Sequence, residues 1–148
     1  DLGKIHLPAA ILNKPGRLSE HEFAIIRQHA ETAYEILKNI DFPWPIAEAI
    51  YQHHERLDGS GYPRGLQGDE IILEARIIAV ADVAESISSF RPYRQALGTE
   101  AAMSELRKGR GVLFDPHIVD ICLDLFEVQG FDFNVKFIKS RPQELEEI

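Results

Sequence analysis

The chain has 148 residues, of which 45% are hydrophobic and 27% are charged, a size and balance typical of one globular domain rather than two. No apolar run approaches the roughly 20 residues that cross a bilayer, so we expect no membrane insertion. The formal net charge of −8 argues against nucleic-acid binding, and the single cysteine, Cys122, excludes a disulfide framework and fits a reducing cytoplasm.

Apolar residues recur with helical period along most of the chain, which predicts an all-α domain. The first long helix is expected to start at Ser19, because Ser19 and Glu22 have the spacing of a capping box, and to end before Pro43. His29 lies one turn before Ala33, on the inward apolar stripe of this helix.

A second helix is expected to start at Pro45 and to carry the adjacent pair His53 and His54. A loop rich in glycine follows over residues 57–68. Glycines let backbone amides approach a ligand closely, and Tyr62 in this loop can stack on a ligand or donate its hydroxyl hydrogen. An ordinary turn is the alternative interpretation of the same residues.

Asp82 lies in the middle of a strongly apolar helix that we expect from about Leu73 to Ser89. A carboxylate in such a helix is costly to bury without a cation or several hydrogen bonds. An ion pair with Arg76 or Arg91 is the competing account.

Two further helices and an arm are predicted for the last third of the chain. Thr99 can cap a short helix, and Asp115, followed by proline, is the start signal of an amphipathic closing helix. We expect the domain to span residues 1–128, and residues 129–148 to form an irregular arm with a frayed acidic tail.

Ionisable groups therefore occupy inward-facing positions at three places: His29, the pair His53 and His54, and Asp82. A neutral buried histidine or a surface pair would explain either histidine feature alone. Taken together, imidazole and carboxylate groups from several helices favour a metal site for iron, manganese or zinc.

Three cationic residues are candidates for contacting phosphate: Lys4, Arg91 and Arg94. Each can neutralise phosphate oxygens, and the arginine fork suits a phosphodiester. A solvated surface position is the alternative for each of them.

Several segments, in this order, resemble the signature blocks of the HD-GYP family. They are Asp1-Leu2-Gly3-Lys4-Ile5, His29, the block from His53 to Pro63, Ala81-Asp82-Val83 and Arg91-Pro92-Tyr93-Arg94. The block from His53 to Pro63 is the most specific, and the similarity covers residues 1–126. The resemblance implies an HD-superfamily helical bundle and a bacterial metal-dependent phosphodiesterase that hydrolyses cyclic di-GMP, with some members preferring cyclic GMP-AMP.

The same resemblance implies a role for each matching residue. The implied metal ligands, for two or three iron or manganese ions, are Asp1, His29, His53, His54 and Asp82. The implied catalytic positions are Asp1 and Lys4, and the implied contacts to substrate are Lys4, Gly61, Tyr62, Arg91 and Arg94. A diguanylate cyclase and a sensor or receiver domain are the implied protein partners.

The family has a histidine directly before the position of Asp1, where this sequence begins. We therefore expect incomplete metal binding and slow turnover or none. Two other functions remain open from the sequence: a catalytically weak module that binds signalling partners, and another nucleotide phosphohydrolase of the HD superfamily.

Overall fold

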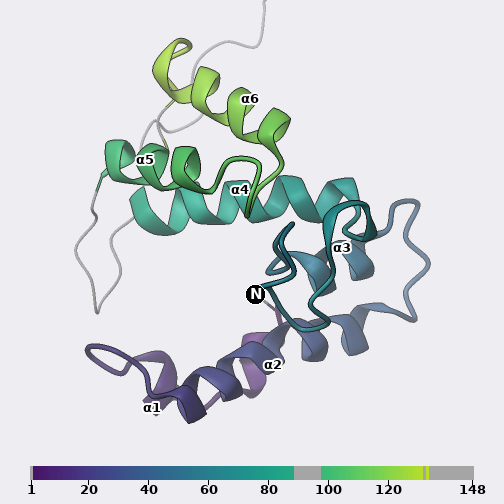
Figure 1. The fold of residues 1–148 in the computed structure, drawn as a ribbon. Helices are drawn as coiled ribbons and strands as arrows, with labels where there is room; N and C mark the ends of the chain where they lie inside the picture. The colour runs from purple at the N-terminus through teal and green to yellow at the C-terminus, as the bar shows by residue number, and fades with distance from the viewer. Residues whose placement is uncertain (1, 89–97, 132, 134–148) are drawn as a thin grey trace, which may run out of the picture.

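The computed structural model describes residues 2–88, 98–131 and 133 (Figure 1). Its elements in chain order are the 3-10 helix η1 (Leu2–His6), α1 (Ala9–Leu12), α2 (Glu20–Leu37), α3 (Ile46–Gln52), the 3-10 helix η2 (Gly68–Glu70), α4 (Leu73–Ser88), α5 (Thr99–Gly109) and α6 (Pro116–Glu127). These described ranges contain no β-strand, only two isolated bridges. The predicted all-α fold is confirmed.

Two helices begin at the signals that the sequence predicts. The Ser19 hydroxyl accepts the Glu22 backbone N–H at 3.3 Å, and the Glu22 carboxylate accepts the Ser19 N–H at 2.7 Å, which completes a capping box before α2. The Asp115 carboxylate accepts the His117 N–H at 2.9 Å, with Pro116 as the first residue of α6. Both starting points are confirmed.

Two other predicted details are wrong. Helix α3 ends at Gln52 and His53 is its C-cap, so the histidine pair follows this helix instead of lying on it. The Glu55 N–H donates to the Gln52 carbonyl at 2.8 Å, which closes a turn at this point. Helix α5 does start at Thr99, but its N-cap is Gly98 and no side chain caps it.

The main hydrophobic core lies between α4, α5 and α6. Helix α4 crosses the middle of the molecule, with α5 and α6 packed against it and α3 also in contact with it (Figure 1). This core consists of Val80, Ala84, Ala102, Met103, Leu106, Phe114, Val119 and Cys122. Because close-packed apolar side chains resist displacement, the core fixes α4 and with it the position of Asp82.

A second packing unit joins η1, α2 and α3. Gly3 lets η1 lie directly on α2, since a Cβ atom at this position would come within 1.9 Å of the His29 backbone oxygen and 2.8 Å of the Ala33 nitrogen. The η1 segment, which carries Lys4, is therefore held against the turn of α2 that contains His29.

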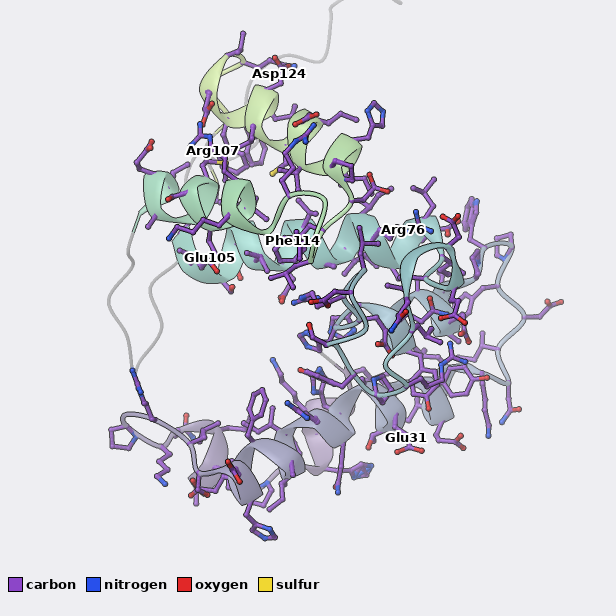
Figure 2. All side chains as sticks on the ribbon, viewed as in Figure 1. Glu31, Arg76, Glu105, Arg107, Phe114 and Asp124 are labelled. Carbon is purple, nitrogen blue, oxygen red and sulfur yellow. The ribbon has the colours of Figure 1, made fainter. Side chains whose placement is uncertain are left out.

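Arg76 and Phe114, both labelled in Figure 2, connect the main core to the segment that follows α3. From α4, Arg76 donates to the carboxylate of Asp115 at 3.2 Å and to that of Asp69 at 3.0 Å. The Arg56 guanidinium lies 5.0 Å from the ring centroid of Phe114. The loop that follows the histidine pair is thereby fastened to the main core.

The end of the described chain packs back on α6. The ring centroids of Phe131 and Phe133 lie 5.1 Å and 5.2 Å from that of Phe126. The rest of the predicted arm lies outside the described residues, so the boundary at residue 128 stays a prediction. No helix in the described part of the chain combines the length and the hydropathy needed to cross a bilayer.

Replacement of Gly3 by alanine tests the packing of η1 on α2. The added methyl group would overlap the His29 backbone, so we expect the free energy of unfolding to fall by about 2 kcal/mol in urea denaturation. The control is Ala10→Ser, which also adds one heavy atom but lies exposed on α1 and should change stability by at most about 0.5 kcal/mol. Equal effects of the two substitutions would contradict this packing.

Candidate metal centre

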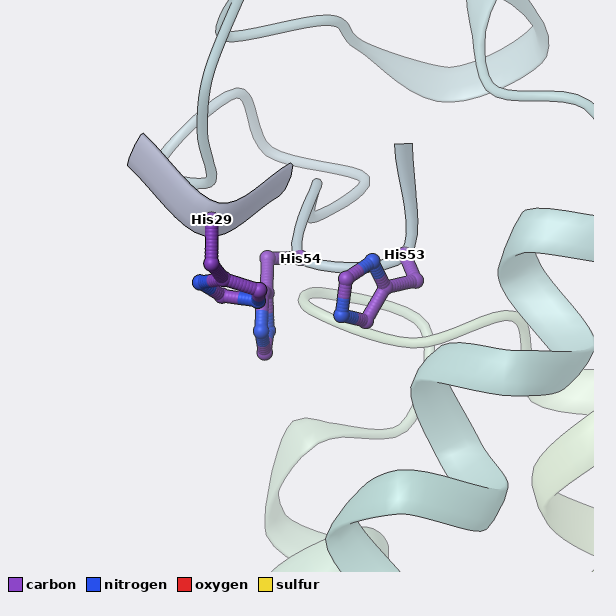
Figure 3. Close-up of side chains that lie close together, drawn as sticks. All are labelled: His29, His53 and His54. Carbon is purple, nitrogen blue, oxygen red and sulfur yellow. The ribbon is translucent and has the colours of Figure 1, made fainter. Parts of the chain in front are cut away.

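Three of the histidines singled out by the sequence converge on one point. His29 extends from α2, and His53 and His54 follow the end of α3 (Figure 3). One ring nitrogen from each of them lies within 4.8 Å of the corresponding nitrogens of the other two. His29 and His53 are buried, and His54 is partly buried.

Backbone carbonyls orient two of these rings. The Nδ1–H of His29 donates to the Ile26 carbonyl at 2.6 Å, and the Nδ1–H of His53 donates to the Ile50 carbonyl at 2.5 Å. A carbonyl oxygen can only accept, so in each neutral ring the hydrogen must be on Nδ1 and the lone pair on Nε2. This arrangement of a bonded Nδ1 and an available Nε2 is the usual one for histidines that bind metals.

Tyr62 holds the third ring in a different way. Its ring is stacked on that of His54, with centroids 4.7 Å apart and planes inclined by 29°. Phe23 and Arg27 of α2 also lie against the Tyr62 ring, with the Arg27 guanidinium 5.0 Å from the tyrosine centroid. The predicted glycine-rich loop therefore does reach the histidine cluster.

Burial keeps the three imidazoles neutral. Desolvation is the main reason that the pKa values of His29 and His53 are lowered and that the pKa of His54 falls to about 2. Hydrogen bonds from Nδ1 to backbone carbonyls oppose this lowering for His29 and His53. Neutral rings have free lone pairs, which is the form that coordinates a cation.

The cluster fits a divalent cation. The Nε2 atom of His29 is buried and has no hydrogen-bond partner among the described residues. An unpaired polar atom inside a protein is destabilising, and a metal ion would satisfy it. Imidazole nitrogens suit iron, manganese and zinc, whereas magnesium and calcium prefer oxygen ligands.

Asp82 lies near this cluster but is not part of it. The side chain is partly buried on α4, and its charge raises the pKa values of both His29 and His53. Its oxygens fall outside the group of ligand atoms within 4.8 Å. Arg76, one of the predicted ion-pair partners of Asp82, instead binds Asp69 and Asp115. A ligand role for Asp82 stays a prediction.

The other predicted site residues divide into two groups. Lys4 is partly buried on η1, and its charge lowers the pKa values of His29 and His54, so it lies close to the cluster. Gly61 precedes Tyr62 in the loop against the histidines. The predicted residues Asp1, Arg91 and Arg94 lie outside the described residues.

Glu55 and Gln52 are buried polar residues that sequence reasoning missed. Each is only 2% exposed. The Gln52 side chain accepts the Ile72 N–H at 2.9 Å, and the Glu55 carboxylate accepts the N–H groups of Arg64 and Leu66 at 2.7 Å and 3.0 Å. The position of Glu55 directly after the histidine pair was a signal that it lies near the site. A glutamate at this position could equally well be exposed to solvent, so the sequence alone did not indicate its burial.

Comparison with known proteins places this site in a family. The family profile described as HD domain matches residues 1–118, most of the chain. This match includes the three histidines, Asp82 and the glycine-rich loop.

Curated relatives are similar to this chain over most of its length. The cyclic di-GMP phosphodiesterase response regulator RpfG of Xanthomonas campestris is 46% identical over 125 residues, which cover 83% of this chain and 33% of the relative. The 3'3'-cGAMP-specific phosphodiesterase 1 of Vibrio cholerae is 45% identical over 72% of this chain and 25% of its own length. A cyclic di-GMP phosphodiesterase of Thermotoga maritima is 42% identical over 84% of this chain and 34% of its own. The chain thus spans about a quarter to a third of these relatives.

Removal of one imidazole tests the cluster. We expect His29→Ala to weaken Mn²⁺ binding at least about 10-fold in isothermal titration calorimetry, because the Nε2 that has no partner among the described residues is lost. His21→Ala, at an exposed position of the same helix, is the control and should bind as the unchanged protein does. Loss of binding in both variants, or in neither, would count against a centre at His29.

Proposed function

The chain belongs to the HD domain family, in its HD-GYP branch, and we propose that it hydrolyses a phosphodiester bond of a cyclic dinucleotide with divalent metal ions as cofactors. The observation that carries the proposal is the group of three neutral imidazoles beside the glycine-rich loop. The names of the relatives add the substrate class, since they describe cyclic di-GMP and 3'3'-cGAMP phosphodiesterases.

The metal ligands in this proposal are His29, His53, His54, Asp82 and Asp1. By resemblance to the family, iron or manganese is the proposed metal, with two or three ions in the complete site. Imidazole nitrogens and carboxylate oxygens without thiolates are compatible with these ions. Such ions supply an activated water and positive charge for the phosphate oxygens. No protein nucleophile is then needed.

Protein side chains bind and orient the substrate in this scheme. Burial raises the pKa of Tyr62 to about 12, so its hydroxyl stays protonated and can donate to a phosphate oxygen. Lys4, near the cluster, is the proposed cationic contact to phosphate. By resemblance to the family, Gly61, Arg91 and Arg94 complete the binding of substrate.

Cyclic di-GMP is the proposed substrate, with the linear dinucleotide or GMP as product. RpfG is described as a response regulator, which supports a sensor or receiver domain as partner, and a diguanylate cyclase is a second proposed partner. A bacterial cytoplasm is the proposed location, because the single cysteine fits a reducing compartment.

A catalytically weak interaction module is less well supported. Such a module would have no use for three desolvated imidazoles, two buried and one partly buried, of which His29 has an Nε2 without a partner among the described residues. A nucleotide phosphohydrolase with linear substrates uses similar chemistry, so substrate specificity must distinguish it.

Turnover of cyclic di-GMP by the full-length protein, followed by liquid chromatography with Mn²⁺ or Fe²⁺ present, tests the function. We expect His53→Ala to lower kcat/KM by at least about 100-fold, because a ligand is lost, and His21→Ala to retain activity within about twofold. Faster hydrolysis of linear nucleotides would favour the alternative phosphohydrolase. Metal binding without any turnover would favour the interaction module.

Replacement of Asp82 by asparagine tests whether α4 contributes a ligand. We expect about 10-fold weaker Mn²⁺ binding and fewer ions per chain in elemental analysis, since asparagine lacks the anionic charge. Asp41→Asn, at an exposed position between α2 and α3, is the matched control. Unchanged metal content in Asp82→Asn would show that Asp82 is not a metal ligand.

A further inference from the structure

Glu55 is a buried acid placed between the histidine pair and the glycine-rich loop. It is 2% exposed and follows His54 directly. Its Oε1 accepts the Arg64 N–H at 2.7 Å and its Oε2 accepts the Leu66 N–H at 3.0 Å. Both oxygens of one carboxylate therefore hold the backbone of the loop where it returns at Arg64 and Leu66.

The opposite side of the loop lies directly on the backbone of the same segment. A Cβ atom at Gly61 would come within 2.4 Å of the Glu55 Cα and 2.5 Å of the Arg56 nitrogen, so only glycine allows this approach. The Tyr62 N–H donates to the His54 carbonyl at 3.3 Å. These contacts fix the backbone of the loop on both sides of the Tyr62 side chain.

His54 depends on this loop more than the other two histidines do. Backbone carbonyls accept from the Nδ1 atoms of His29 and His53. Across the described ranges, neither ring nitrogen of His54 takes part in a hydrogen bond. Its ring instead packs on Tyr62 at 4.7 Å and on His53 at 3.9 Å. Tyr62 is therefore the residue of the loop that orients the His54 ring.

We propose that Glu55 is a positioning residue that fixes the glycine-rich loop so that Tyr62 holds the His54 ring in the orientation required to bind metal. The inference rests on the proposed metal centre and adds a group that contacts neither the ion nor the substrate. Residues beyond the ligands that orient a coordinating histidine commonly change metal affinity by roughly 10–100-fold when they are replaced.

Glu55→Gln is the main variant, because it keeps the size of the side chain but can accept only one of the two N–H groups. Two readouts separate positioning from stability alone: Mn²⁺ affinity by calorimetry, and the rate of trypsin cleavage at the Arg64–Gly65 bond, which reports opening of the loop. We expect Mn²⁺ binding about 10-fold weaker and cleavage about 10-fold faster. The matched control is Glu70→Gln, whose carboxylate accepts the Gln67 N–H at 2.8 Å at an exposed position, and which should change both by less than about twofold.

A second pair of variants leaves Glu55 in place and applies if Glu55→Gln does not fold. Tyr62→Phe retains the aromatic ring on His54, whereas Tyr62→Leu removes it. We expect Tyr62→Phe to bind Mn²⁺ as the unchanged protein does and Tyr62→Leu to bind it about 10-fold more weakly, with unchanged trypsin cleavage in both.

Three outcomes would overturn the proposal. Faster cleavage with unchanged Mn²⁺ affinity in Glu55→Gln would show that the loop does not orient the ligand. Equal Mn²⁺ affinity in Tyr62→Phe and Tyr62→Leu would show that the ring is not required. An unchanged protein that binds no Mn²⁺ would overturn the metal centre as well, which distinguishes failure of the proposed function from failure of the role of Glu55 alone.

Discussion

Burial of three imidazoles against one another is the constraint on which the rest of this structure depends. Each ring loses its hydration, and burial holds all three in the neutral form. Two lone pairs are directed by backbone carbonyls, and the Nε2 of His29 has no partner in the described part of the chain. Such an arrangement is unfavourable for a helical core alone and favourable around a cation, which explains why polar groups occupy positions where carbon would pack better.

The apolar core and the ionisable groups lie in two different regions of the fold. Helices α4, α5 and α6 enclose the apolar core, while η1, α2 and the segment after α3 present the ionisable groups. Arg56 on Phe114 and Arg76 on Asp69 tie the loop that follows the histidine pair to the rigid core. Asp82 lies at this junction, on a core helix but close enough to influence the charge of the imidazoles.

Local sequence signals predicted what local interactions determine. The capping box at Ser19 and the apolar stripe through His29 set both the start of α2 and the face that carries the ligand. The end of α3 could not be predicted, because no glycine or proline follows Gln52 closely and the helix is closed by a turn within the site itself. The role of Glu55 was equally hidden, since its partners are residues 64 and 66 and its burial depends on how the loop folds back.

His29 and the pair that follows α3 are separated by more than twenty positions along the chain, yet they would share one ion. An ion held by both segments acts as a cross-link between α2 and α3, so occupancy and the packing of these helices become a single linked equilibrium. At a free metal concentration 100 times the dissociation constant, such linkage stabilises the folded state by about 2.7 kcal/mol. Metal supply would thereby set the fraction of molecules in which this half of the domain is folded. When the metal is scarce, more of the protein would be unfolded and open to degradation.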